Sequence, residues 1–519
     1  MTSQAQELNI GILLTSHDVP KPISDFLKSL PSQIRATCFS LSGQLKKKDK
    51  TGPITDILNK IIFKLDSRYL RRTPYRDLLN HVAITAEPVR SYDDLKALNF
   101  DYLISFDGSP LPQEALSFTK KGAFLLQAGL GDISADFYGF WEVFHRQVTT
   151  DFRIDHQGID GKISSALAGS LLTQPSFLLN KAYIAQKALH YLKIYLEKLS
   201  EGTESSLNHL RSSDLSHPRD PSAFELCSYI FKRIFRTLQE KKTLRQGKEQ
   251  QWNVAFKKAE WNPTILSQGI SFPINSDQFF ADPFVITKDN RHYCFVEEYD
   301  FKTSLGHISA FELTEKEALP LGVVFKEPFH LSFPYLFEYQ NELYMCPETS
   351  GAREIRVYKC NEFPMRWTFV KAIMKDISAV DSMLFEQEGR WWMLTNIDSL
   401  QRNDHCTELL AFSADSPLSD KWTAHPSNPL VINPKKARNG GLLRKGCDLY
   451  RVSQVQGFGV YGAASCVHKI LNISQSDYRE ETVARIAPDF FPNIFGTHHL
   501  HSDGAVTVYD FCRNVTIKK

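Results

Sequence analysis

Two aspartates, Asp282 and Asp381, stand in equivalent places of a passage that recurs five times in the second half of the chain. In each copy a short polar or turn-forming signature leads into an alternating apolar strand, a hydrophilic turn and a second strand rich in aromatic residues. Two carboxylates that face one pocket can provide acid–base chemistry, with one of them acting as a general base. Whether they share a pocket depends on the elements that carry them.

The spacing of the signatures indicates which elements those are. The signatures carry, in chain order, Asp282, Pro334, Asp381, Asn439 and His498, and successive members are 47 to 59 residues apart. A repeat of about 40 to 60 residues that holds several short strands is typical of a β-propeller, whose innermost strands surround a central channel. We therefore expect an all-β five-bladed β-propeller over residues 252–519, with these side chains in a polar ring at one channel mouth. The alternative is that they are only turn formers at strand entries.

Further charged residues of the same passages extend the candidate site. Glu348 ends the second strand of the second passage, and Glu297 and Glu298 hold the corresponding place in the first. Each of these is a candidate proton donor or, alternatively, a solvated strand end. Arg438 beside Asn439 suggests an anionic or phosphorylated sugar as ligand, because arginine pairs with phosphate or carboxylate through two parallel hydrogen bonds.

The remaining candidates for sugar binding are a histidine group and two residues near the fourth passage. His330 precedes the second signature, and His498 and His499 alternate along a predicted strand, so only one of that pair should face the channel. Their spacing supports no metal site, and we expect none. Gln454 and Tyr461 fall in a predicted loop after the fourth passage, where they are expected to line the pocket.

The ordered signatures resemble the propeller module of glucosamine inositolphosphorylceramide transferases. The resemblance covers roughly residues 252–519 and rests on the segments Ala281–Phe284, His330–Pro334, Met345–Glu348, Val380–Ser382, Ala437–Gly441 and Gly496–Leu500. That module also occurs in bacterial proteins behind a formyltransferase-like domain, which implies a bacterial protein. It is similar in turn to the five-bladed glycosidases that cut arabinans and xylans.

The likeness to these glycosidases implies roles for the carboxylates. In those enzymes one aspartate is the general base and a second orients the acid and tunes its pKa, and Asp282 and Asp381 sit in these places. A glutamic acid of the fourth blade protonates the leaving oxygen, but the fourth signature of this chain begins with Arg438 and holds no carboxylate. Glycoside cleavage needs a proton donor and arginine does not release its proton, so we do not expect simple hydrolysis.

The first 200 residues show the pattern of an α/β domain. Apolar runs at residues 9–14, 100–106 and 123–126 alternate with helical stretches at 23–30 and 113–118, and residues 165–200 are expected to be largely helical. Strands that alternate with helices indicate a parallel sheet, in which ligands lie beyond the carboxyl ends of the strands. No glycine-rich phosphate loop is present in the sequence.

This domain resembles, more weakly, the formyltransferases that use formyl-tetrahydrofolate. The resemblance rests on residues 121–127, 138–144 and 152–163, and it implies a site built from Asn, His and Asp. The matching positions hold Leu125, Gln127 and Asp160. Formyl transfer needs a base and an oxyanion donor; leucine supplies neither, and glutamine can donate but cannot act as the base. We expect a degenerate site without formyl transfer, and a structural or ligand-binding role remains open.

Residues 201–251 have the composition of a linker that contains a helix. Residues 200–220 are rich in Ser, Glu, Asn, Asp and Pro, whereas residues 224–238 have the spacing of an amphipathic helix. The basic run at 236–248 is expected to be a solvated connector. Weak contact of residues 224–248 with an anionic membrane surface is the alternative.

Composition restricts the partners and the compartment. The net charge of the 519-residue chain is +2, which gives no reason to expect nucleic acid or an anionic membrane as a partner. The nine cysteines are odd in number and form no CxxC pair, which favours a reducing compartment over a disulfide framework or a zinc site. The polar start and the absence of long apolar runs lead us to expect a cytoplasmic protein.

Together these features favour an enzyme: a glycan or sugar-phosphate transferase of bacterial surface polysaccharide or glycolipid synthesis. Its expected catalytic residues are Asp282, Asp381 and Glu348, with a nucleotide sugar or sugar phosphate as substrate and no other cofactor. The first alternative is a non-catalytic sugar-binding module, which the missing acid of the fourth signature favours. The second, a sugar N-formyltransferase, is disfavoured by Leu125 and Gln127.

Overall fold

A computed structural model describes residues 6–14, 16–41, 52–78, 80–89, 91–96, 98–128, 137–204, 206–207, 219–245 and 248–516. The chain forms two compact units, Met1–Leu238 and Gln239–Lys519. The polar linker stretch at 208–218 and residues 246–247 of the basic run lie outside the described residues. No helix in the described ranges is long and apolar enough to cross a membrane.

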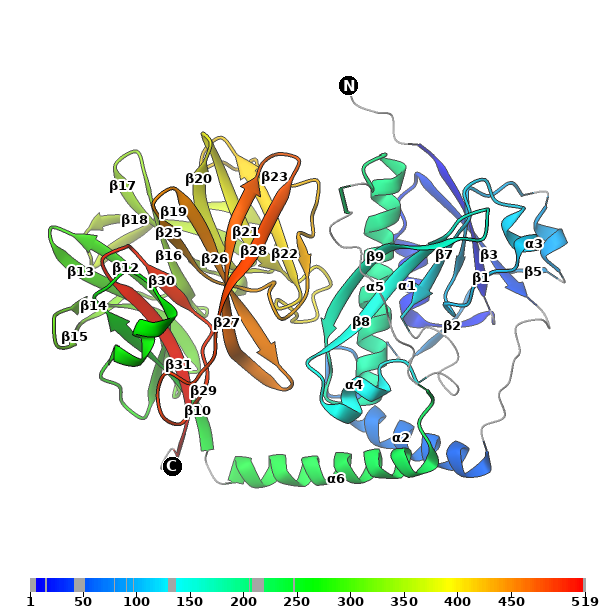
Figure 1. Cartoon of the computed structure of the whole chain (residues 1–519), viewed down its shortest axis with the longest axis horizontal. Coiled ribbons are helices and arrows are strands. Elements are labelled where there is room, and N and C mark those ends of the chain that lie inside the picture. Colours follow the sequence, from blue (N-terminus) through cyan, green and yellow to red (C-terminus); the bar gives the residue numbers. More distant parts are fainter. Residues whose placement is uncertain are drawn as a thin grey trace. The chain divides into compact units, whose positions relative to one another are not determined.

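The first unit contains a seven-stranded mixed sheet (Figure 1). Its spatial order is β5-β3-β1-β6-β7-β8-β9, in which β1 runs parallel to β3 and β6, and β6 parallel to β7. The strands are β1 (Leu8–Leu14), β3 (Ile34–Leu41), β5 (Glu87–Val89), β6 (Tyr102–Ser105), β7 (Ala123–Gln127), β8 (Thr149–Gln157) and β9 (Ile163–Leu172). A short pair, β2 (Asp18–Pro20) and β4 (His81–Ala83), lies apart from this sheet. The predicted parallel strands are therefore present, but β8 and β9 add an antiparallel hairpin.

The helices of this unit are α1 (Lys21–Ser29), α2 (Pro53–Leu70), α3 (Gln113–Leu116), α4 (Phe140–His145), α5 (Phe177–Ser200) and α6 (Ala223–Arg245). The prediction that residues 165–200 are largely helical is confirmed for Phe177–Ser200, which form α5, but its start was wrong, because Ile163–Leu172 pairs with β8 as strand β9. The buried residues of α5 run along most of its length, as expected for the central helix of a unit. On α6, Leu226 and Tyr229 are buried in a cluster with Leu58 and Ile62 of α2.

The second unit is almost entirely β-structure, in sets of antiparallel strands (Figure 1). Three sets form separate sheets: β12 (Gln278–Lys288), β13 (Arg291–Asp300), β14 (Leu305–Leu313) and β15 (Ala318–Phe325); β16 (Ser332–Tyr339), β17 (Glu342–Glu348), β18 (Glu354–Glu362) and β19 (Arg366–Lys375); β20 (Ala379–Gln387), β21 (Arg390–Ile397), β22 (Glu408–Ala414) and β23 (Thr423–Ala424), with β24 (Val431–Ile432) also on β22.

The remaining strands join into one sheet of order β11-β10-β31-β30-β25-β26-β27-β28. They are β10 (Lys248–Lys257), β11 (Ile270–Ser271), β25 (Asn439–Lys445), β26 (Asp448–Gly457), β27 (Val460–Ile473), β28 (Tyr478–Ile486), β30 (Leu500–Ser502) and β31 (Thr507–Thr516), with β29 (Ile494–Gly496) on β31. The first strand of the unit, β10, pairs with the last, β31, from Lys248 opposite Thr516 to Lys257 opposite Thr507. The two ends of the unit are therefore held together by a strand pair.

Candidate functional site

Four β-bulges determine where the signature side chains lie. The first strand of each set slips its register against the second at Ala281/Phe284, Ser332/Tyr335, Val380/Met383 and Asn439/Leu442. Within three of these bulges Asp282, Phe333 and Asp381 have left-handed φ values of 50°, 48° and 50°. Aspartate adopts this conformation more readily than most residues, and a bulge re-aims the side chain that it contains. The bulges thus turn both aspartates into the same cluster.

The bulges correct the predicted ring at two positions. Phe333, not Pro334, takes the aspartate position in the second set, because the proline follows the left-handed residue. In the fourth set the position belongs to Gly440, since Asn439 is the last paired residue before the bulge. A Cβ atom on Gly440 would lie 2.2 Å from the backbone oxygen of His498. Glycine is therefore required there by the close approach of the histidine segment.

Asp282 is held by two neighbouring histidines. Its Oδ1 lies 3.2 Å from Nε2 of His498 and 3.5 Å from Nδ1 of His499. The expectation that only one histidine could turn inward was wrong, because the pair lies in an irregular segment before β30. Asp510 on β31 fixes this segment: its Oδ1 accepts hydrogen bonds from the backbone N–H groups of both histidines at 2.9 and 3.0 Å.

The histidine contacts keep Asp282 ionised. Burial opposes its ionisation, but the contacts with His498 and His499 outweigh burial and hold its pKa well below the ordinary value. Burial likewise disfavours a charged His498, yet Asp510, 2.8 Å from its Nδ1, and Asp282 raise the pKa of His498 to about 10. His498 is therefore an imidazolium between two carboxylates at neutral pH.

The same three side chains have the composition of a cation site. Asp282, His498 and Asp510 offer ligand atoms that all lie within 4.8 Å of one another. A metal would need a neutral imidazole nitrogen, however, and both nitrogens of His498 face carboxylates that favour its protonated form. The donor set thus fits an imidazolium better than a metal ion.

Arg438 binds the second aspartate. Its Nε donates to Oδ2 of Asp381 at 2.6 Å, and its Nη2 lies 3.9 Å from Oε2 of Glu348. Gln454 also donates to Oδ2 of Asp381, at 3.2 Å. Ser350 donates to the other Glu348 oxygen at 2.7 Å. The structure therefore brings together the three predicted catalytic carboxyl groups, although Arg438 is already occupied by two of them.

Asp381 and Glu348 both contact the guanidinium of Arg438. If both were ionised, their two negative charges would exceed its single positive charge. Burial, together with the charges of Glu348 and Asp282, raises the pKa of Asp381 to about 7 in spite of Arg438. Burial and the charge of Asp282 likewise raise the pKa of Glu348. The pair can therefore take up or release a proton near neutral pH.

Glu297 was only an alternative in the sequence, but it is a central member of the cluster. It lies on β13 opposite Ala281, the residue before Asp282, and it is buried. Burial, followed by the charges of Asp282 and Glu348, raises its pKa well above the ordinary value. Glu298, the other alternative, contacts His307 instead. Glu297 and Asp282 are thus neighbouring carboxyl groups whose pKa values are shifted in opposite directions.

The more exposed members of the cluster are His330 and Tyr461. The side chain of His330 is 37 % exposed, and its Nε2 lies 3.4 Å from Oε1 of Glu297. Tyr461 is partly exposed and lies under the guanidinium of Arg438, 5.2 Å from the ring centre. Tyr461 and Gln454 belong to strands β27 and β26, so the predicted loop was wrong.

Asn439 does not have the position of a ligand-binding residue. It is fully buried, and its Nδ2 donates to the backbone oxygens of Asp381 and Leu394 at 2.9 and 3.1 Å. It therefore holds the third and fourth strand sets together. His499 is also fully buried, so a sugar would meet His498 or His330 first.

The residues matched to a formyltransferase site do not form one. Leu125 is buried in the core of the first unit, and Gln127 donates to the backbone oxygen of Gly108 at 2.7 Å. Asp160 lies in the turn between β8 and β9 and pairs with Lys162. Because Gln157 pairs with Ala123 and Arg153 with Gln127, that turn lies at the opposite end of β7 from Gln127.

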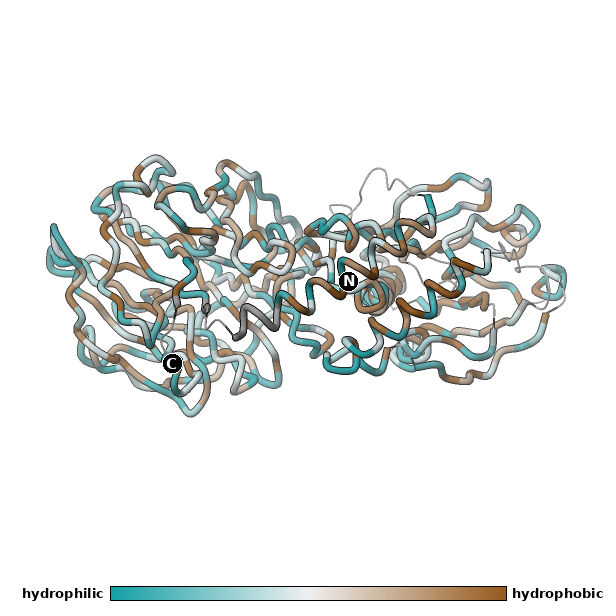
Figure 2. The backbone as a smooth tube through the Cα atoms, turned by 90° about the horizontal axis from the view of Figure 1, so that it is seen from below, coloured by the Kyte–Doolittle hydropathy of each residue, from teal (hydrophilic) through white to brown (hydrophobic). Residues whose placement is uncertain are grey.

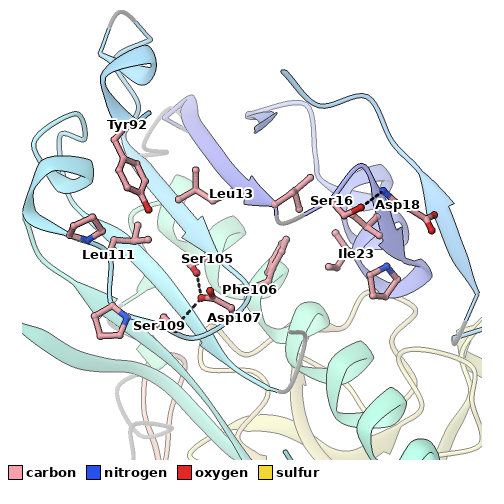
Figure 3. Close-up of a pocket in the computed structure, with 15 residues that line it drawn as sticks. Leu13, Ser16, Asp18, Ile23, Tyr92, Ser105, Phe106, Asp107, Ser109 and Leu111 are labelled. Atoms are coloured by element: carbon pink, nitrogen blue, oxygen red, sulfur yellow. Dashed lines mark hydrogen bonds between the residues drawn. The ribbon is translucent and has the colours of Figure 1, made fainter. Parts of the chain in front are cut away.

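The first unit has a cavity at the sheet edge where parallel sheets bind ligands, away from the residues matched to a formyltransferase site (Figure 3). Its volume is about 170 Å³, and it lies beyond the carboxyl ends of β1 and β6. This is where the strand order reverses, because β3 lies on one side of β1 and β6 on the other. Asp107 stands at its polar side, accepting hydrogen bonds from Ser105 and the backbone of Ser109. The sequence pattern predicted that a ligand of this domain would lie at the carboxyl ends of the parallel strands, but it did not indicate Asp107 or the other residues of the cavity.

The cluster thus combines buried carboxyl groups and cations on a β-scaffold, and it reaches the surface at His330 and Tyr461. Comparison with known proteins shows what this unit is similar to. Residues 237–488 match the family model described as glucosamine inositolphosphorylceramide transferase 1, N-terminal. A protein of that name from Oryza sativa subsp. japonica is 32 % identical over 247 residues, which are 46 % of this chain and 31 % of the relative. The one from Arabidopsis thaliana is 34 % identical over 229 residues, 43 % and 29 % of the two chains.

The matched region is thus similar to the N-terminal region of glucosamine inositolphosphorylceramide transferases, the family that the ordered signatures resemble. The chain spans about a third of the length of these curated relatives. Similar solved structures include the catalytic domain of an α-L-arabinofuranosidase from Coprinopsis cinerea, with a TM-score of 0.36, 13 % identity and coverage of 45 % of this chain and 82 % of that one. Another is an arabinanase from Bacillus subtilis, with a TM-score of 0.33, 11 % identity and coverage of 44 % and 92 %.

Proposed function

We propose that the protein is a carbohydrate-active transferase whose second unit is a five-bladed propeller with its sugar site at the charged cluster. The strand sets β12–β15, β16–β19, β20–β23, β25–β28 and β30-β31-β10-β11 would be the five blades. A bulge at the same place in four of the sets supports this interpretation. The match of residues 237–488 to the family model described as glucosamine inositolphosphorylceramide transferase 1, N-terminal, supports a sugar transfer reaction.

The observation that carries the proposal is that two carboxyl groups brought together by the pairing of β12 with β13 have pKa values shifted in opposite directions. Asp282 is held ionised by its histidines, and Glu297 is held protonated by burial and by the charge of Asp282. Environments that push the pKa values of adjacent carboxyl groups apart define an acid and its charged partner. A structural role alone would need neither a buried uncharged acid nor a carboxylate clamped by two imidazoles.

Glycosyl transfer then uses the groups as follows. Glu297 donates its proton to the leaving oxygen while the bond from that oxygen to the anomeric carbon breaks. The fixed charge of Asp282 stabilises the positive charge that develops on the sugar. The acceptor hydroxyl forms the new bond and gives its proton to the Glu348–Asp381 pair, whose raised pKa values suit a base near neutral pH. Proton exchange with water restores both groups.

The geometry changes the expected substrate contact of Arg438. Its Nε and Nη2 already contact Asp381 and Glu348, so the guanidinium has no complete fork left for a phosphate. We therefore assign the cluster to the hydroxyl groups of a sugar ring. The leaving phosphate oxygen of a donor would meet the cluster at Glu297 and not at Arg438.

A non-catalytic sugar-binding module is the second candidate. Asp282 and Asp381 are only 5 % and 1 % exposed, which favours a role in fixing the shape of a binding site. The family model is that of an N-terminal region, and the transfer reaction of the long relatives can belong to another part of their chains.

Turnover separates the two candidates. The full-length protein would be incubated with nucleotide sugars and sugar phosphates, each with glycolipid and oligosaccharide acceptors, and ligand binding would be followed by calorimetry. We expect Glu297→Gln to abolish transfer while ligand binding is kept, and the matched variant Glu298→Gln to retain both. Sugar binding without turnover in the unchanged protein would instead establish the binding module.

A further inference from the structure

Helix α6 carries a second apolar face that the first unit does not bury. Its inner face places Leu226 and Tyr229 in the core. On the opposite side Phe224, Phe231 and Phe235 are 81 %, 71 % and 51 % exposed. Ile234 and Leu238 are exposed too. They lie on the same side of the helix as the phenylalanines, because residues spaced by three, four or seven positions share a helix face. Three exposed phenylalanines on one helix face far exceed the isolated apolar residues that are normal on a surface.

Helix α2 extends this exposed apolar face. Ile54, Ile57 and Ile61 follow one another at helical spacing, and 65 %, 59 % and 40 % of their surfaces are exposed. The two helices are packed side by side, since Tyr229 donates to Oδ2 of Asp66 at 2.8 Å. Figure 1 places both helices along the lower edge of the first unit, so the view from below in Figure 2 looks onto them. We call the exposed side chains of α2 and α6 the apolar face.

Positive charge borders the apolar face. On α2 the stripe of isoleucines continues into Lys64 and Arg68, and Lys60 is exposed beside it. On α6 the apolar positions are interleaved with Lys232 and Arg236. Of the acids on the described part of these helices, Asp66 is buried and Glu225 is paired with Arg219, whereas Asp56 of α2 is exposed. Lys60, Lys64, Arg68, Lys232 and Arg236 outnumber this exposed acid, so the described part of this surface carries a positive excess.

We propose that the apolar face docks the protein onto an anionic lipid membrane. Helices with aromatic and aliphatic side chains on one side and Lys and Arg beside them lie in the membrane interface, with the apolar side chains at the headgroup boundary. Negative lipid headgroups complement the positive border. A second copy of the chain would bring the same positive border against itself, which disfavours self-association through this face. No described helix can span the bilayer, so the contact is peripheral.

The proposal does not depend on the sugar chemistry, and its test uses vesicles without glycans. The full-length protein would be sedimented with phosphatidylcholine vesicles and with vesicles that also contain about 30 % phosphatidylserine. We expect binding to the anionic vesicles to be at least about tenfold stronger and to weaken in high salt. Equal binding to both compositions, or binding to neither, would overturn the proposal.

Paired variants test the residues. Phe231→Ser/Phe235→Ser and Lys60→Glu/Lys64→Glu should each weaken binding to the anionic vesicles at least about tenfold at unchanged melting temperature. The matched control is Phe369→Ser/Leu471→Ser, which removes two side chains of the second unit that are 51 % and 52 % exposed. This control should bind as the unchanged protein does. The proposal fails if the control weakens binding equally, or if the phenylalanine variant instead turns a dimer into a monomer in light scattering without vesicles.

Discussion

Asp510 contacts His498 through both of its carboxylate oxygens: Oδ2 lies 2.8 Å from Nδ1 of the ring, and Oδ1 accepts the backbone N–H at 2.9 Å. The side chain and the main chain of one histidine are thus fixed by a single acid on a different strand. The same arrangement places both histidine rings beside Asp282.

Replacing Asp510 should destabilise the second unit in a pH-dependent way. The pKa of His498 is raised from 6.5 to about 10, so its stabilising contribution is full below about pH 6.5 and is lost as the pH rises through about 10. We expect Asp510→Asn to lower the free energy of unfolding by about 3 kcal/mol at pH 7. Urea titrations at pH 7 and pH 10.5 should show this difference shrinking at the higher pH. The same difference at both values would contradict the imidazolium.

Removing the ionisable group of Glu297 should cost no stability at neutral pH. The folded pKa of Glu297 is raised, so its contribution is present below the unfolded value of about 4.5 and declines as the pH rises above it. Glu297→Gln keeps the size of the side chain and removes this unfavourable term. The variant should melt at the same or a higher temperature than the unchanged protein at pH 8, although transfer is lost. A lower melting temperature at pH 8 would show that Glu297 is ionised in the folded protein.

Arg438 and Asp381 should be energetically coupled. Arg438→Met leaves Asp381 and Glu348 without their cation, and breaking a buried pair in this way costs about 3 to 5 kcal/mol. Adding Asp381→Asn to that variant should recover part of the loss. Chemical unfolding of the two single variants and the double variant would give a coupling energy of about 1 to 3 kcal/mol. If the losses of unfolding free energy in the two single variants simply add up in the double variant, Arg438 and Asp381 are not energetically coupled.

Gly440 should tolerate no side chain. A Cβ there would meet the backbone oxygen of His498 at 2.2 Å, and the backbone cannot move aside without disturbing Asp282. We expect Gly440→Ala to reduce the free energy of unfolding by about 1 to 3 kcal/mol and to impair ligand binding. Gly52→Ala is the matched control, because nothing lies within 4 Å of a Cβ at that position. Similar thermal stability of both variants would contradict the close approach.

The recurring signatures predicted which carboxyl groups would meet but not their register. The structure brings Asp282, Asp381 and Glu348 together, and their catalytic roles stay predictions. Aligning Asp282 with Pro334 was wrong by one residue, because the bulge places the left-handed residue before the proline. Aligning the prolines of the two signatures, Pro283 and Pro334, would have given Phe333.

Other features of the site depend on contacts that sequence patterns do not record. The protonation of Glu297 follows from burial and from acids on other strands. Asp510 could have been found from the sequence, because it is a charged residue between Tyr509 and Phe511 in a largely apolar strand. A charged residue in such a strand indicates a buried acid with a specific partner. The pairing of Arg438 with Asp381 and Glu348 joins residues far apart in the chain, and no local sequence pattern shows that these acids occupy the arginine.

The pairing of β10 with β31 has a consequence for how the protein is made. The two strands are some 250 residues apart in the chain, and a ribosome adds about 5 to 20 residues per second. From the time β10 is synthesised until β31 follows, one of its edges is an open row of backbone donors and acceptors for tens of seconds. Such an edge attracts other strands, and nascent chains on one messenger would be the nearest source. The final residues of the unit are thus the ones that end its exposure to misassembly.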